Sequence, residues 1–220
     1  MTTRSTFSRE LEELNSSLEK MSIAAEEAIE QALKALISND RETAQRLVKE
    51  DEAIDQMERD IETRCLNLML RQQPVAADLR HISTALKVVT DLERIGDHAA
   101  DIAELTLSIN GEDSCDEIQH LPTMAENVKT MLRAAITAFI NRDVAAAREI
   151  EKTDDVIDEL FVKTRKEVVQ LIAGDISKSD KAIDFLMVAK YLERIGDHAV
   201  NVCEWTEFSV NGSVNDVRIL

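Results

Sequence analysis

One stretch of eight residues occurs twice in this chain. Residues Leu92 to Ala99 read LERIGDHA, and the same eight letters recur from Leu192 to Ala199, 100 positions later. A repeat at a fixed period indicates a duplicated structural unit, and it constrains the architecture more than local propensity does. The octet is polar at its centre, whereas packing alone would more readily preserve a run of leucines. We therefore expect two similar units that carry the same functional element.

The first half of the chain shows a helical pattern. Apolar residues recur at three- and four-residue spacing, which predicts amphipathic helices over about 8–38, from the N-cap Asp40 to about 71, and over about 75–109. Aromatic residues make up only 3% of the chain, too few for the core of a β-sandwich. The composition and the pattern together predict an all-α fold.

The second half repeats this plan with a small change of spacing. Matching apolar and acidic positions of the first two helices lie 103 residues apart, and the offset falls to 100 before the octet. We predict two tandem antiparallel three-helix bundles related by pseudo-two-fold symmetry. The first bundle is expected over residues 1–112 and the second over 113–220, joined through the polar segment 110–115.

Charge and composition exclude several classes of function. The chain has 26 basic and 43 acidic residues, a net charge of −17, which opposes binding to nucleic acids and to anionic membranes. No apolar run approaches the roughly 20 residues that span a bilayer, and the first residues lack the apolar core of a signal peptide. We expect a cytoplasmic protein with no membrane insertion. Cys65, Cys115 and Cys203 are widely spaced and odd in number, so we expect reduced, packed thiols.

Acidic residues form a stripe along the helices that carry the octets. On a helix that turns 100° per residue, Glu93, Asp97 and Glu104 lie on one line. The helix before each octet also carries acids four residues apart. The resulting candidate metal ligands are four matched pairs, namely Asp51 and Asp55, Glu93 and Asp97, Asp154 and Asp158, and Glu193 and Asp197.

These acid pairs suggest cation binding. If the second and third helices of each bundle are antiparallel neighbours, the pairs face each other, and a spacing of four residues, about 6 Å, suits adjacent ions. Ligands that are all oxygen favour Mg²⁺, Mn²⁺ or iron over a soft metal. The alternative is a solvated face with salt bridges to Arg94 and Arg194. Duplication of the whole pattern favours the shared cation site.

Other residues of the octet have supporting roles. Gly96 and Gly196 each cost a helix about 1 kcal/mol relative to alanine, so we expect a neighbouring helix to approach closely there. His98 and His198 lie about 140° from the acids, which favours packed or supporting histidines over direct ligands. The Glu-x-x-His motif of di-iron bundles is absent, because Gly96 stands three residues after Glu93.

The flanks of the stripe differ between the copies. Asp101 of the first copy becomes Asn201 in the second, which predicts two similar but unequal sites. Whether Asp101, Glu104, Asn201 and Glu204 are ligands stays open. The chain shows no glycine-rich phosphate loop and no convincing Ser or Cys nucleophile. The leading hypothesis is a non-enzymatic regulator with metal clusters. The alternatives are a carboxylate-bridged phosphohydrolase or oxidase, and a purely structural scaffold.

Three features together identify a resemblance. With LERIGDHA in both halves, the acid pairs, and RQQPVAADLRHI from Arg71 to Ile82, nearly the whole chain resembles the PhoU family of bacterial phosphate-signalling regulators. The resemblance implies two three-helix bundles, often assembled as a homodimer. It also implies multinuclear metal sites on Glu/Asp-x-x-x-Asp motifs, which map to the four acid pairs above. The metal in such proteins is iron, zinc, manganese or magnesium.

The resemblance also implies a biological role. Such proteins are adaptors between the ATPase subunit of the high-affinity phosphate ABC transporter and a membrane sensor histidine kinase. When phosphate is plentiful, they favour the inhibitory state of the kinase and dampen the phosphate-starvation response. A place at the inner face of the membrane, reached through protein partners, is compatible with this role. The absence of a catalytic constellation and the long acidic helical faces fit a protein that binds proteins.

Overall fold

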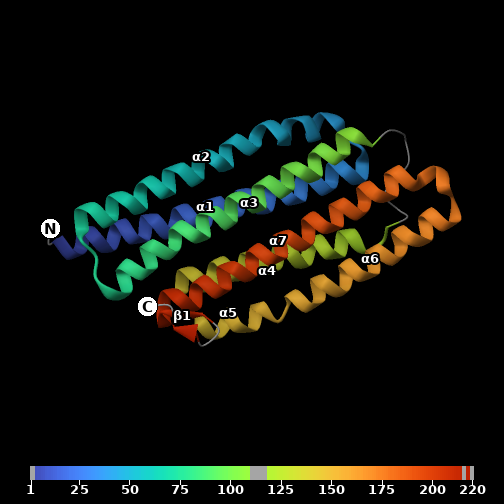
Figure 1. Ribbon diagram of the computed structural model, residues 1–220. Helices are drawn as coiled ribbons and strands as arrows, with labels where there is room; N and C mark the ends of the chain where they lie inside the picture. The colour runs from blue at the N-terminus through green and yellow to red at the C-terminus, as the bar shows by residue number, and fades with distance from the viewer. Residues whose placement is uncertain (1–2, 110–117, 215–216, 219–220) are drawn as a thin grey trace.

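The first half of the chain forms three long helices that pack as one bundle. The structure, a computed structural model, describes residues 3–109, 118–214 and 217–218. Helix α1 spans Thr3–Ser38, α2 spans Arg41–Gln72 and α3 spans Ala76–Ser108 (Figure 1). The bounds of α2 and α3 agree with the prediction to within one residue, whereas α1 begins at Thr3, about five residues earlier than predicted. The first three-helix bundle is thus confirmed in its elements.

Local sequence explains where these helices begin and end. The side chain of Asp40 accepts a hydrogen bond from the backbone N–H of Thr43 at 3.0 Å, and it therefore caps α2 as predicted. Helix α2 ends where Gln73 adopts a left-handed conformation. Because Pro74 follows, the helix cannot continue through this turn, and the chain reverses into α3.

The second half repeats the bundle with one interruption. Helix α4 spans His120–Asn141, α5 spans Val144–Glu151, α6 spans Asp154–Gly174 and α7 spans Ser179–Asn211. A short 3₁₀ turn, η2, spans Ile176–Lys178 between α6 and α7. The sequence predicted a single helix where the structure has α5 and α6, so that detail of the prediction was wrong.

The interruption between α5 and α6 has a local cause. At Thr153 the backbone N–H donates to the carbonyl oxygen of Ile150 at 2.8 Å, and the hydroxyl donates to the same oxygen at 2.6 Å. The threonine side chain thereby competes with the regular helical hydrogen bond and produces a tight turn. The turn lies directly before Asp154, one of the candidate ligands.

The two bundles share one core. Helices α3 and α7 pack against each other at the centre of the molecule, and α1 packs against α4 (Figure 1). One continuous cluster of buried apolar side chains runs through both bundles. Two charged contacts link α1 to α4: Lys129 donates to Glu30 at 3.0 Å, and Arg133 pairs with the buried Glu26. Burial of this shared apolar surface makes the two bundles a single elongated body.

Two arginines complete the ends of the central helices. Arg41 donates to the carbonyl oxygen of Leu107 at 2.7 Å, and Arg80 donates to the carbonyl oxygen of Val210 at 3.1 Å. Both oxygens lie in the last turn of a helix, where intrahelical donors are missing. After α7, the strands β1 (Ser213–Val214) and β2 (Val217–Arg218) pair antiparallel as a small addition to the all-α fold.

Other sequence predictions have the following outcomes. Cys65 and Cys203 are buried free thiols, as predicted, whereas Cys115 lies outside the described residues. The predicted boundary between 1–112 and 113–220, and the whole joining segment 110–115, also lie outside them. Among the described helices, none has the length and apolar character needed to span a bilayer.

Candidate metal centre

Glycine brings the acidic faces of α2 and α3 together. A Cβ atom added at Gly96 would lie 3.0 Å from two side-chain carbons of Ile54 and 3.5 Å from the Oδ1 atom of Asp51. A side chain at position 96 would therefore require the Ile54 side chain to shift by a few tenths of an ångström. The predicted close approach at Gly96 is confirmed, and it places the acids of α2 beside those of α3.

Three carboxylates of the first half meet across this contact. Asp51 and Asp55 from α2 and Asp97 from α3 can each place one oxygen so that all three oxygens lie within 4.8 Å of one another. All three residues are half-buried. Among the described residues, this is the one group of acidic, histidine or cysteine side chains with that spacing. The structure therefore brings together three of the four candidate ligands of the first half.

The fourth candidate ligand of the first half, Glu93, lies beside this group with one carboxylate oxygen buried. Its Oε2 atom is buried and accepts no hydrogen bond in the described part of the chain, although Arg94 Nε lies 3.4 Å away. Burial, together with the negative charge of Asp97, raises the pKa of Glu93 to about 7. Arg94 also donates to Asp97 at 2.7 Å. One arginine thus serves two carboxylates and leaves the buried Glu93 oxygen without a donor.

Asp51 lies at the centre of the negative charge. Burial and the nearby charges of Asp97 and Asp55 raise the pKa of Asp51 to about 6, and Asp101 and Glu104 contribute to the same shift. Like charges held this close favour the protonated form or a bound cation. Asp101 and Glu104 also line, with Asp51 and Asp97, an open hollow of about 330 Å³. Both residues therefore border the site.

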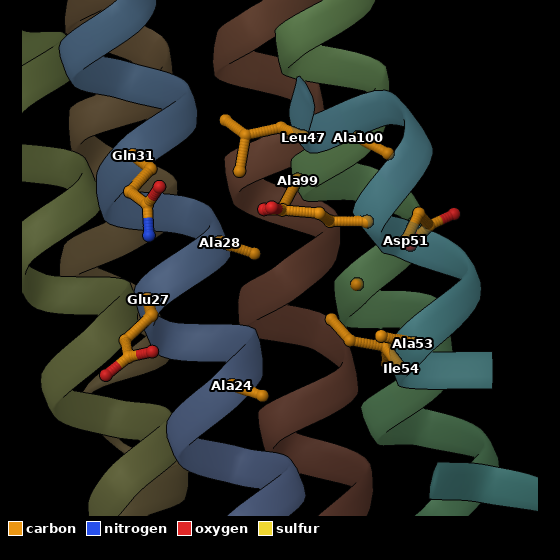
Figure 2. A pocket seen from close by; sticks show the side chains of 12 residues that line it. Ala24, Glu27, Ala28, Gln31, Leu47, Asp51, Ala53, Ile54, Ala99 and Ala100 are labelled. Carbon is orange, nitrogen blue, oxygen red and sulfur yellow. The ribbon is translucent and has the colours of Figure 1, made fainter. Parts of the chain in front are cut away.

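A second hollow lies on the other side of Asp51. Figure 2 shows this pocket between α1 and α2, with Ala24 and Ala28 on one wall, Asp51 on the other, and Ala99 from α3 at its base. Its volume is about 170 Å³. Alanine and glycine residues form part of its lining, and Asp51 borders both hollows.

The second half arranges the same residue types differently. A Cβ atom added at Gly196 would lie 3.1 Å from the Oδ1 atom of Asp154 and 3.1 Å from a carbon of Ile157, which confirms the second close approach. Burial, with the charges of Asp158 and Asp197, raises the pKa of Asp154 to about 6. The four candidates of this half interact, but they do not form a group of three within the 4.8 Å spacing.

The neighbours of the acids also differ between the halves. Lys190 pairs with Glu193, whereas the corresponding residue of the first half, Thr90, donates to Glu58 and leaves Glu93 unengaged by a lysine. Asp158 and Asp197 are exposed, unlike their half-buried counterparts. The turn at Thr153 adds to this difference, because it alters the helix directly before Asp154.

The two octet histidines lie between the bundles. The rings of His98 and His198 are 5.7 Å apart, and His98 stacks on Tyr191 at 5.5 Å. The Nδ1 atom of His98 lies 3.2 Å from a carboxylate oxygen of Asp101. Both octet histidines are packed at the contact between the bundles, as predicted.

A carboxylate that the sequence reasoning missed organises this interface. The buried Asp91 accepts hydrogen bonds from His198 Nδ1 at 2.8 Å, Asn201 Nδ2 at 3.0 Å and Trp205 Nε1 at 3.1 Å. All three donors belong to α7, so Asp91 ties α3 to α7. The sequence does show a difference at this position. Directly before the octets, Asp91 of the first copy corresponds to Tyr191 of the second.

This interface gives a physical reason for the difference between Asp101 and Asn201. Asn201 donates an N–H to the Asp91 carboxylate, and an aspartate at that position would place two negative charges together. Asp101, the counterpart of Asn201, meets no such carboxylate, because the counterpart of Asp91 is Tyr191. Tyr191 stacks on His98, and Asp101 lies beside the same histidine. The substitution therefore serves the contact between the bundles.

Comparison with known proteins assigns the chain to a family. Residues 18–106 and 121–206 each match the model of the PhoU domain. A phosphate-specific transport system accessory protein PhoU homologue from Clostridium acetobutylicum is 40% identical over 217 residues, which cover 98% of this chain and 99% of the relative. Homologue 1 from Thermotoga maritima is 35% identical, with 90% and 86% covered.

Solved structures agree with this match. The crystal structure of the phosphate transport system regulatory protein PhoU from Streptococcus pneumoniae has a TM-score of 0.86 at 30% identity, covering 96% of this chain and 100% of that one. PhoU from Pseudomonas aeruginosa has a TM-score of 0.83 at 32% identity, with 94% and 100% covered. The fold, the repeated domain and the sequence all match over most of the chain, and the protein belongs to the PhoU family.

Proposed function

We propose that this protein regulates phosphate uptake as a non-enzymatic adaptor between the ATPase subunit of a phosphate ABC transporter and a sensor histidine kinase. In this role it dampens the phosphate-starvation response when phosphate is plentiful. The observation that carries the proposal is the match, over 98% of the chain, to a relative named as an accessory protein of phosphate-specific transport. The structure is compatible with an adaptor, because its helices present long exposed faces.

The proposal includes metal ions bound by carboxylates. In the first half, Asp51, Asp55 and Asp97 would hold the metal, and the donor-free Oε2 atom of Glu93 fits a role as a further ligand. A bound cation would neutralise the repulsion that raises the pKa values of Asp51 and Glu93. Oxygen ligands suit magnesium, manganese or iron, and zinc also accepts carboxylates.

A second metal site is proposed for the other half, on Asp154, Asp158, Glu193 and Asp197. The raised pKa of Asp154, caused by burial and the neighbouring acids, supports it. Because Lys190 already neutralises Glu193 in part, we expect this site to bind metal more weakly than the first. In both halves the metal would fasten two helices together and stiffen the surface that partners contact.

The adaptor role is tested with purified components. The transporter ATPase and the cytoplasmic part of the sensor kinase are each titrated against this protein, loaded with metal, at high and at low phosphate concentration. We expect binding to both proteins, and we expect deletion of the gene to raise expression from a phosphate-starvation promoter in phosphate-rich medium. Lack of binding to either protein at both phosphate concentrations would contradict the proposal.

Two further parts of the proposal have separate tests. A homodimer would appear in sedimentation equilibrium as twice the 24.7 kDa chain mass. Metal-loaded protein should show no turnover of phosphomonoesters and no consumption of dioxygen. Turnover that disappears in an Asp97→Asn variant would instead support the carboxylate-bridged metalloenzyme, because two-metal sites do catalyse such reactions.

A further inference from the structure

One arginine contacts the acidic site of the first half. Arg94 Nη1 donates to the Oδ2 atom of Asp97 at 2.7 Å, and Arg94 Nε lies 3.4 Å from the buried Oε2 atom of Glu93. Arg94 also borders, with Asp51 and Asp97, the open hollow beside the candidate ligands. The guanidinium group is therefore paired with two of the four candidate ligands of this half.

The arginine of the second octet makes no such contact. Arg194 is exposed, and within the described part of the chain it forms neither an ion pair nor a hydrogen bond. Glu193 pairs instead with Lys190, about one helical turn earlier. Because the two octets are identical in sequence, local sequence alone does not produce the contact of Arg94 with Asp97. That contact accompanies the gathered carboxylates of the first half, which attract a positive charge.

The acids of the first half exceed the positive charge of Arg94. Asp51, Asp55 and Asp97 gather within 4.8 Å, and Glu93 lies beside them. Burial and the charge of Asp97 raise the pKa of Asp51 to about 6. Burial and the same charge raise the pKa of Glu93 to about 7, although Arg94 opposes this rise. One guanidinium group therefore balances the negative charge of the site only in part.

Arg94 is free to leave these acids. Its side chain is 55% exposed, whereas those of Glu93 and Asp97 are 16% and 32% exposed. Ion pairs that reach solvent contribute little free energy, because water solvates the separated partners well. A divalent cation bound by the same carboxylates would repel the guanidinium group, because like charges at neighbouring positions oppose each other.

We propose that Arg94 is an exchangeable counter-ion of the first metal site. Its guanidinium group pairs with Glu93 and Asp97 while no metal is bound, and it turns into solvent when these carboxylates bind a divalent cation. Arg94 thereby sets the metal concentration at which the site fills. The inference rests on the proposed metal binding and adds an internal competitor to it. An arginine that instead oriented Asp97 toward the metal would strengthen binding, so the two roles predict opposite effects of its removal.

Arg194 provides a matched control. Its replacement by glutamine changes the net charge as much as replacement of Arg94 does, within the same eight-letter sequence. Its charge also reaches the first half. Burial lowers the pKa of His98, Asp101 opposes this effect, and the charge of Arg194 adds to it. Removal of Arg194 therefore takes away a nearby positive charge without breaking a contact to the acids.

Calorimetric titration of metal-free protein with Mn²⁺ measures the competition. We expect Arg94→Gln to tighten the stronger binding event at least about threefold, because the cation then displaces no ion pair. Arg194→Gln should change this event less than about twofold, and Arg94→Lys, which keeps the positive charge, should stay within about twofold of the wild type. Weaker or unchanged Mn²⁺ binding by Arg94→Gln would overturn the proposal. An equal gain in Arg194→Gln would overturn it too.

Chemical labelling of the wild type tests the movement without a substitution. The reagent p-hydroxyphenylglyoxal modifies accessible guanidinium groups, and mass spectrometry of the peptides gives the rate at each arginine. We expect saturating Mn²⁺ to raise the rate at Arg94 at least about threefold and to leave the rate at Arg194 unchanged, because only Arg94 loses its carboxylate partners. A rate at Arg94 that stays constant or falls would show that the group remains on the acids, and the proposal would be wrong.

The outcomes separate this inference from the proposed function. If the wild type binds Mn²⁺, but Arg94→Gln binds it no more tightly or the labelling of Arg94 does not rise, Arg94 is not the counter-ion and the metal site stands. If the wild type binds no Mn²⁺, the inference and the Mn²⁺ site fail together. The adaptor role is judged in either case by the binding of the transporter ATPase and the sensor kinase.

Discussion

The two halves of the molecule carry the same octet and the same spacing of acids, but their surroundings differ. In the first half, Asp51, Asp55 and Asp97 gather within 4.8 Å and are half-buried. In the second half, Asp158 and Asp197 are exposed. The comparison shows that both copies contain the candidate ligands, whereas the spacing and the burial of those ligands differ between the copies.

The interface between the bundles shows the same contrast. Asp91 of the first half accepts three hydrogen bonds from α7, and its counterpart Tyr191 stacks on His98. One position therefore holds a buried charge with its donors, and the other holds an aromatic ring. The pseudo-symmetry of the backbone does not extend to these contacts.

The largest expected effect concerns the corresponding residues Asp91 and Tyr191. We expect Asp91→Ala to lower the free energy of unfolding by about 3 kcal/mol, because three donors of α7 lose their acceptor. Tyr191→Ala should cost less, about 1 to 2 kcal/mol, because it removes ring stacking from a half-buried site. Urea unfolding measures both values. Equal losses would show that the two sides of the interface contribute alike.

Metal binding should also differ between the halves. We expect Asp51→Asn to weaken the tighter Mn²⁺ binding event by roughly tenfold to a hundredfold, because it removes a ligand from the gathered set. Asp154→Asn should leave that event unchanged and affect only a weaker one. Calorimetric titration of metal-free protein and elemental analysis measure the two events. If Asp154→Asn abolishes the tighter event, the assignment of the stronger site to the first half is wrong.

A buried histidine between the bundles should make stability depend on pH. Burial lowers the pKa of His81 to about 4, with a further lowering by Arg142 and an opposing effect of Asp78. Between pH 6.5 and 4 the unfolded chain binds a proton that the folded protein does not, so stability falls as the pH falls through this range. We expect a loss of about 2 kcal/mol at pH 5 relative to pH 7.

The counterpart of His81 in the second half is Lys181, so we expect this pH dependence of stability to arise from the first half alone. His81→Gln provides the control, because glutamine does not titrate and can still reach Asn15, the present hydrogen-bond partner at 3.1 Å. Unfolding curves at several pH values should be flatter for this variant. The same loss in the variant would assign the pH dependence to other groups.

The smallest expected effect comes from exchanging one neighbour between the halves. A nearby lysine competes with a bound cation for the carboxylate. Lys190→Thr should therefore release Glu193 and raise the metal affinity of the second site about threefold. Thr90→Lys should lower the metal affinity of the first site by a similar factor. Competition with a fluorescent chelator resolves changes of this size. If neither exchange alters affinity, the lysine does not cause the difference between the sites.

Much of the site followed from residues read along the chain. The spacing of Asp51 and Asp55 on one helix and of Glu93 and Asp97 on the next predicted facing acids, and the structure confirms that three of the four meet. Gly96 predicted a close approach because glycine is costly inside a helix, and the Ile54 contact confirms it. These inferences worked because helical periodicity is local and is retained in the folded protein.

The remaining features depended on contacts between helices. Asp91 has no special appearance in the sequence, because its three partners lie on α7, more than 100 residues away. The turn at Thr153 was missed because a single threonine within a helical pattern does not usually end a helix. The unequal sites were predicted from Asn201, and the structure relates that residue to the bundle interface.

The sequence by itself determined the duplication, the helical class, the family and the residue types of both candidate metal sites, because these follow from repeated letters and periodic spacing. Only the tertiary structure decided that the octet histidines meet between the bundles and that the carboxylates gather in the first half. The physical reason is that a helix fixes which residues share its face, whereas packing between helices, as at Gly96 and Gly196, fixes which faces meet.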